Sequence, residues 1–332
     1  AQKLLKVKTD EESWNIQIEE QEEILKALGQ ALEELLCEAD SLEAGAKTAD
    51  EEIRRLNRNL NNTQQEYHTA YTKLESLRNL AERYEGYGNS IRRVMECRDR
   101  IHGIHGVVAD LIDVPKEYEI AIETALGGSI QNVVTDSEET AKALIEYLKK
   151  NKYGRATFLP LTGISGRGGL EETRALKEPG AIGVAADLVR AKKEYSGLLQ
   201  YLLGRVLVAD NIDHAIAIAR KYRHSIRIVT LEGELLNPGG SLSGGAYKNS
   251  SNLLGRKREM EELEDVCQKA LIRVDNIQKE LVLREKELEE KTSALSGVKE
   301  KIQGKYLEEN TAKLSLEQLQ EKKEELFESS RD

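Results

Sequence analysis

Few residues of this chain are spaced as catalysis or metal binding requires. No segment matches the phosphate-cradling pattern G-x-x-x-x-G-K-[ST] or the serine elbow G-x-S-x-G. His102 and His105 have no cysteine or carboxylate at metal-ligand spacing. Cys37, Cys97 and Cys267 are isolated, which indicates a reduced, intracellular protein without a disulfide framework. The sequence therefore predicts no catalytic residue, metal or cofactor in these 332 residues.

A glycine-rich run, Pro238–Gly245, is the most distinctive local motif. Its segment Leu242–Gly245 resembles the signature motif of ABC-type ATPases, but no P-loop accompanies it. One interpretation is a flexible loop; the other is a subunit interface where a second backbone approaches closely. Gly127-Gly128 is equally ambiguous, because a helix C-cap also explains it. The candidate interface glycines are Gly127, Gly128, Gly239, Gly240, Gly244 and Gly245.

Basic residues form local clusters although the chain has a net charge of −10. One set surrounds the junctions between the middle of the chain and its flanks: Arg92, Arg93, Arg98, Arg100, Arg256, Lys257 and Arg258. A second set is Lys149, Lys150, Lys152 and Arg155, and a third is Arg220, Lys221, Arg223 and Arg227. Such patches neutralise phosphates independently of base sequence. Solvated helix ends are the alternative interpretation.

The elements that carry these residues follow from proline, glycine and apolar spacing. All four prolines and 18 of 25 glycines lie between Asp99 and Asn252. Heptad stepping from Trp14 meets 19 apolar residues in 21 positions, and stepping from Met260 meets 15 in 20. A sustained period of 3.5 predicts coiled coils. The economical solution is one antiparallel coiled coil within the chain, with pairing between chains as the alternative.

The middle of the chain contains an internal repeat. Gly106–Leu111 (GVVADL) recurs as Gly183–Leu188 (GVAADL), and Lys116-Glu117-Tyr118 recurs at the same offset of 77. Each half predicts an α/β unit, with Asp136 or Asn211 capping a helix. The predicted domains are an N-terminal arm 1–98 with a joint near 85–89, a middle domain 99–252 and a C-terminal arm 253–332. The halves span about 103–162 and 180–245, joined by the linker 163–169.

Together these features resemble the hinge region of bacterial structural maintenance of chromosomes (SMC) proteins. The matching segments are Glu85–Tyr87, Gly106–Leu111, Ala125–Gly128, Arg155–Leu161 and Pro238–Gly245. The resemblance implies a pseudo-repeated α/β hinge domain between two arms, a homodimer through the six glycines, and DNA contact at the junctions. It also implies a noncatalytic piece of a chromosome condensation and segregation protein. ATP, Mg, the ATPase head, kleisin and accessory subunits would belong to parts outside this piece.

Two other classes of protein remain as alternatives. One is a cytoskeletal or tethering coiled-coil protein with a spacer domain, and the other is an enzyme domain inserted in a coiled coil. No run of 18 apolar residues and no signal-peptide pattern is present. We therefore expect no membrane partner, and the resemblance to SMC proteins implies a cytoplasmic, nucleoid-associated protein.

Overall fold

A computed structural model describes residues 1–164, 168–246 and 252–331. Part of the predicted linker, 165–167, lies outside the described residues. The chain divides into two compact units, one of residues 1–66 with 269–332 and one of residues 67–268. Two long helices, α1 (Gln2–Glu82) and α8 (Leu253–Arg331), each contribute to both units. No described helix combines the length and apolarity needed to cross a membrane.

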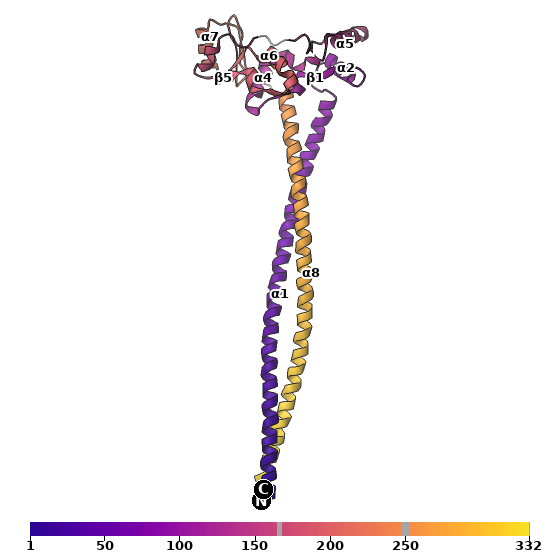
Figure 1. The fold of residues 1–332 in the computed structure, drawn as a ribbon, viewed down its shortest axis with the longest axis vertical. Helices are drawn as coiled ribbons and strands as arrows, with labels where there is room; N and C mark the ends of the chain where they lie inside the picture. The colour runs from indigo at the N-terminus through magenta and orange to yellow at the C-terminus, as the bar shows by residue number, and fades with distance from the viewer. Residues whose placement is uncertain (165–167, 247–251, 332) are drawn as a thin grey trace. The chain divides into compact units, whose positions relative to one another are not determined.

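In the first unit, α1 and α8 run side by side in opposite directions (Figure 1). Leu32 packs with Val298 and Ile302, and Arg273 pairs with Glu66 at 2.9 Å. The buried positions of both helices in this unit fall on the predicted heptad seams: Leu28, Leu32, Ala49, Leu56, Thr63, Ala270, Leu281, Val298, Ile302 and Ala312. The prediction of an intramolecular antiparallel coiled coil is confirmed.

In the second unit, the coiled coil leads into the α/β domain. Ala70 and Leu74 pack with Cys267, so this thiol is part of the apolar seam, as its heptad position predicts. Helix α1 ends at Glu82, and α2 (Asn89–Glu96) follows. Tyr84 and Gly86 between them have φ of 52° and 89°. This left-handed backbone ends the helix and redirects the chain.

The strands of the described α/β domain form three sheets. The first has the order β1 (Ile104–Val107), β3 (Val133–Thr135), β4 (Phe158–Pro160). The second has the order β10 (Leu242–Ser243), β9 (Leu235–Leu236), β8 (Arg227–Thr230), β7 (Val206–Ala209), β5 (Ala181–Val184). The third pairs β2 (Ile112–Asp113) with β6 (Arg190–Ala191).

Helices connect the strands within each half. The first half contains α3 (Val108–Leu111), α4 (Glu119–Leu126) and α5 (Glu138–Asn151), and the second contains α6 (Ser196–Leu203) and α7 (Ile212–Lys221). Short 3-10 helices complete them: η1 (Lys116–Tyr118), η2 (Gly127–Gln131), η3 (Thr173–Lys177), η4 (Ala185–Leu188) and η5 (Lys193–Tyr195).

The topology confirms two pseudo-repeated halves. β1 is antiparallel to β3 and β3 is parallel to β4, while β5, β7 and β8 repeat both relations. Each antiparallel pair has a register shift at the same place, Ile104/Gly106 or Ala181/Gly183. One apolar core contains residues of both halves, including Val133 and Val208. The sheets of the two described halves differ at one edge: only the second continues beyond β8, into β9 and β10.

One predicted helix cap is wrong. Ser137, not Asp136, caps α5, because its backbone is extended and its Oγ accepts a bond from Thr140 N at 3.3 Å. The Asp136 carboxylate instead accepts from Thr140 Oγ1 at 2.5 Å. In the second half, Asn211 caps α7 as predicted, with its Oδ1 2.9 Å from His214 N.

Candidate interfaces for a second copy and for nucleic acid

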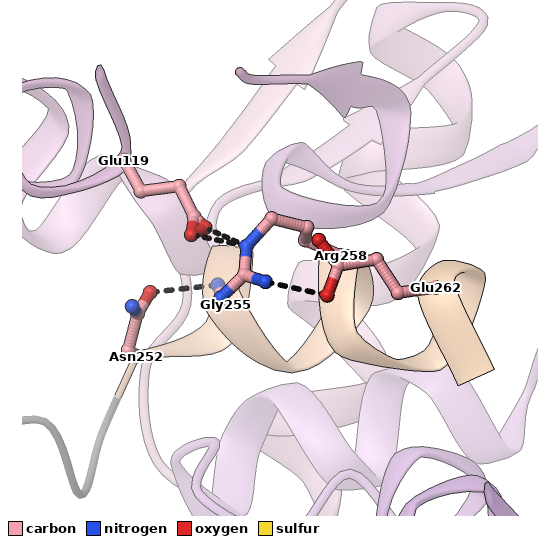
Figure 2. A network of polar contacts seen from close by, with 5 residues as sticks. All are labelled: Glu119, Asn252, Gly255, Arg258 and Glu262. Carbon is pink, nitrogen blue, oxygen red and sulfur yellow. Dashed lines mark hydrogen bonds and ion pairs between the residues drawn. The ribbon is translucent and has the colours of Figure 1, made fainter. Parts of the chain in front are cut away.

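The first turns of α8 are attached to the α/β domain by polar contacts (Figure 2). Asn252 Oδ1 accepts a bond from Gly255 N at 2.8 Å, which satisfies one free donor at the helix start. Arg258 Nε lies 2.6 and 2.7 Å from the two carboxylate oxygens of Glu119 on α4, and Nη1 reaches Glu262. The Glu119 side chain is only 4% exposed, so Arg258 compensates a buried charge.

The two preceding cations are also used within the domain. Lys257 Nζ donates to the carbonyl oxygens of Asp110 (3.0 Å) and Ile112 (2.7 Å) and pairs with Asp113. Arg256 donates to Glu85 O at 2.6 Å, and its guanidinium lies 5.8 Å from the centre of the Tyr87 ring. The three α8 cations predicted to contact DNA therefore all have protein partners in this structure.

The other predicted cations gather where α2 meets the end of α5, two elements that lie together in Figure 1. The Arg93 guanidinium lies 4.6 Å from the centre of the Tyr153 ring, just beyond α5. We define the α2–α5 basic face as Arg93, Arg100, Lys149, Lys150 and Lys152. All except the half-buried Arg93 are exposed. The structure thus brings Arg93 and Arg100, from the predicted junction set, close to the predicted lysine set at the end of α5.

Two of the predicted junction arginines, Arg92 and Arg98, are not part of the α2–α5 basic face. Arg98 is exposed and donates to the carbonyl oxygen of His105 at 3.3 Å. Arg92 is half-buried, and its Nε is buried without a hydrogen-bond partner among the described residues. His105 is half-buried, and its Nδ1 lies 2.8 Å from the hydroxyl oxygen of the buried Tyr195.

The candidate interface glycines fall into two groups by backbone conformation. Gly127, Gly239, Gly240 and Gly245 have positive φ, between 54° and 136°, which already favours glycine. Gly128 and Gly244 do not, so their backbones alone require no glycine. A Cβ at Gly128 would meet no atom within 4 Å, while one at Gly244 would lie 3.2 Å from Glu234 Cγ.

Four described strands end the two larger sheets: β1 and β4 in the first sheet, and β5 and β10 in the second. β4 is the last strand of the first sheet, and β10 is the last strand of the second. Both residues of β10 are exposed, and Leu242 retains 55% of its surface in solvent. The sequence did not predict β9 or β10, although the Gly-rich motif indicated close backbone approach there.

No group of His, Cys, Asp or Glu residues that could hold a metal ion occurs in the described part of the chain. What the surface offers is exposed backbone edges, glycines and cations. These features suit contact with another macromolecule.

Comparison with known proteins identifies the family. Residues 101–219 match the family model described as the SMC proteins Flexible Hinge Domain. Chromosome partition protein Smc of Desulfitobacterium hafniense is 40% identical over 235 residues, covering 69% of this chain and 19% of that protein. The Bacillus subtilis protein of the same name is 42% identical over 197 residues, covering 58% and 17%. The chain thus spans about a fifth of the length of these relatives.

A solved structure of an SMC hinge domain has a similar fold. The SMC hinge domain of Geobacillus stearothermophilus superposes with a TM-score of 0.68 at 35% identity, covering 74% of this chain and 99% of that one. That structure and this one share the α/β domain with flanking helices. The chain belongs to the SMC family and comprises the hinge of a bacterial Smc protein with its adjoining coiled-coil arms.

Proposed function

We propose that this hinge joins two copies of the chain into a homodimer, with β10 of each copy lying along β4 of the other. The observation that carries the proposal is the difference between the halves. In the second half β8 is followed by β9, whereas the equivalent edge of β4 is open. Twofold pairing would cover the edges of β4 and β10 and join a three-stranded sheet to a five-stranded one twice.

The glycines support the same arrangement. Gly244 and Gly245 directly follow β10, and Gly239 and Gly240 precede it. Gly128 has neither a positive φ nor an internal neighbour to exclude a side chain, so contact with another copy explains it best. The Geobacillus stearothermophilus hinge domain was itself crystallised as an asymmetric dimer.

Replacing Gly128 with Phe tests the interface. The monomer has room for the new side chain, so folding should persist while dimer affinity falls by about tenfold or more. Gly168→Phe is the matched control, because Gly168 is also exposed, has no positive φ and has no neighbour within 4 Å. Sedimentation equilibrium gives the dissociation constants, and thermal melting confirms the fold. Equal affinities for the two variants would remove Gly128 from the interface.

The hinge would serve a longer protein. The curated relatives are named chromosome partition proteins, and we infer the same role, in chromosome condensation and segregation, for the protein that contains this chain. Within it, the hinge would tie two arms together without chemistry of its own. ATP, Mg, kleisin and accessory subunits would act at parts beyond these 332 residues.

We also propose that the α2–α5 basic face contacts the DNA backbone. Its exposed cations come from two segments about 50 residues apart, and most have no carboxylate partner in the described structure, Arg93 with Glu96 being the exception. Arg256, Lys257 and Arg258 are poorer candidates, because phosphate would have to displace their protein partners.

A double charge reversal, Lys149→Glu with Lys150→Glu, tests this assignment. Loss of two phosphate contacts should weaken DNA binding and reduce the slope of log K against log salt by roughly 2. Lys192→Glu with Lys193→Glu is the control, since these exposed neighbours lie in the other half and carry the same charge change. If both double variants weaken binding equally, net charge rather than the α2–α5 basic face is responsible.

A further inference from the structure

The open edge of β10 carries an acidic notch at its C-terminal end. Ser243 pairs with Leu235, which brings the neighbouring Gly244 next to Glu234. Buried Thr230 holds this glutamate in place: its Oγ1 donates to the Glu234 carboxylate and accepts from Glu234 N at 3.1 Å. The carboxylate is therefore oriented beside β10 rather than left to move freely in solvent.

The notch has room for a side chain from another molecule. A cavity of about 430 Å³ is lined by Ile212, Glu232, Glu234 and residues 242–245. Glu232 is exposed, and neither glutamate forms an ion pair with a cation among the described residues. Two carboxylates beside an open strand edge favour a basic side chain as occupant.

The proposed dimer supplies such a side chain in only one strand orientation. If β10 runs antiparallel to β4 of the second copy, its C-terminal end lies near the residues before Phe158. Arg155 is three residues away, about 10 Å along an extended chain. It is exposed and has no hydrogen bond or ion pair among the described residues. A parallel arrangement would instead bring uncharged Leu161 to Ile164 to the notch.

We propose that Arg155 of one copy pairs with Glu234 of the other, with Glu232 alongside, and that this pair sets the antiparallel orientation of β10 on β4. The guanidinium fork suits two carboxylates better than an ammonium group would. Twofold symmetry makes the contact twice per dimer. This inference rests on the proposed homodimer and adds to it a charge pair that selects the strand register.

A charge-swap experiment tests the pairing. Arg155→Glu alone and the double variant Glu232→Arg with Glu234→Arg should each lose at least about tenfold in homodimer affinity, because like charges then face each other at both contacts. Mixing the two variants restores an opposite-charge pair at both contacts. Native mass spectrometry of the mixture should therefore show the heterodimer as the dominant species.

Controls separate the possible failures. Lys142→Glu, an exposed charge reversal on α5, should leave the homodimer unchanged and show no preference for the double variant. If the double variant folds poorly, Glu232→Arg alone takes its place, because this change disturbs no contact of Thr230. The single variant should also weaken the homodimer. A statistical mixture of dimers, or monomers that stay folded on mixing, would overturn the Arg155 pairing. A monomeric unaltered chain would overturn the homodimer as well.

Discussion

At the residue scale, the Glu119–Arg258 pair should matter for stability, because it neutralises a carboxylate buried between α4 and α8. Arg258→Met leaves that charge unpaired, and we expect a loss of about 3–5 kcal/mol in the free energy of unfolding. Arg273→Met breaks the exposed pair with Glu66 and should cost about 0–1 kcal/mol. Urea unfolding measures both, and equal losses would contradict the role given to Glu119.

A second residue-scale prediction concerns pH. The Lys221 ammonium lies 2.6 Å from Glu178, and this hydrogen bond lowers the pKa of the Glu178 carboxyl. The pair therefore stabilises the fold above the pKa of an unfolded glutamate, about 4.3, and loses its effect as pH falls through the lower folded pKa. Lys221→Met should raise the Glu178 pKa in an NMR titration. Lys177→Met, which removes an adjacent exposed cation, should leave it unchanged.

The cations show where sequence reasoning stops at this scale. Arg256, Lys257 and Arg258 are consecutive cations, and this sequence pattern does not distinguish phosphate binding from contacts within the protein. Lys257 pairs with Asp113, and Arg258 pairs with Glu119. Both acidic partners lie about 140 residues earlier in the chain, so the local sequence does not predict these pairs. Likewise, the local sequence around Glu232 and Glu234 does not indicate that β9 and β10 place them at an open edge.

At the scale of elements, the coiled coil was predictable because many residues along each arm share the apolar period of 3.5. Thr63 is instructive: it is polar, yet buried at the position that the heptad assigns to the seam. The strands β9 and β10 were not predictable, because two residues carry no periodicity. β9 forms by pairing with β8, and β10 forms by pairing with β9, rather than through local propensity.

The seam provides an element-scale prediction. Leu56 is buried at 2% exposure between the long helices, so Leu56→Ala should destabilise the coiled coil by about 2–5 kcal/mol. Leu36→Ala is the control, because Leu36 lies on an exposed face of α1. Circular dichroism during urea unfolding would follow both variants. A loss for Leu36→Ala as large as that for Leu56→Ala would contradict the heptad assignment.

At the scale of the whole molecule, the pseudo-repeat explains why one domain has two complementary edges. Each half builds the same three-stranded arrangement, but only the second adds β9 and β10. The chain therefore has an open edge at β4 and another at β10, and the proposed twofold dimer uses both.

Sedimentation equilibrium of the 332-residue chain tests this central claim most directly. The account predicts a mass of twice 37.3 kDa for the unaltered chain, with a shift toward 37.3 kDa when Gly128 is replaced by Phe. A mass of 37.3 kDa for the unaltered chain at all concentrations up to about 100 μM, well above the ~1 μM dissociation constant of even a modest interface, would contradict it.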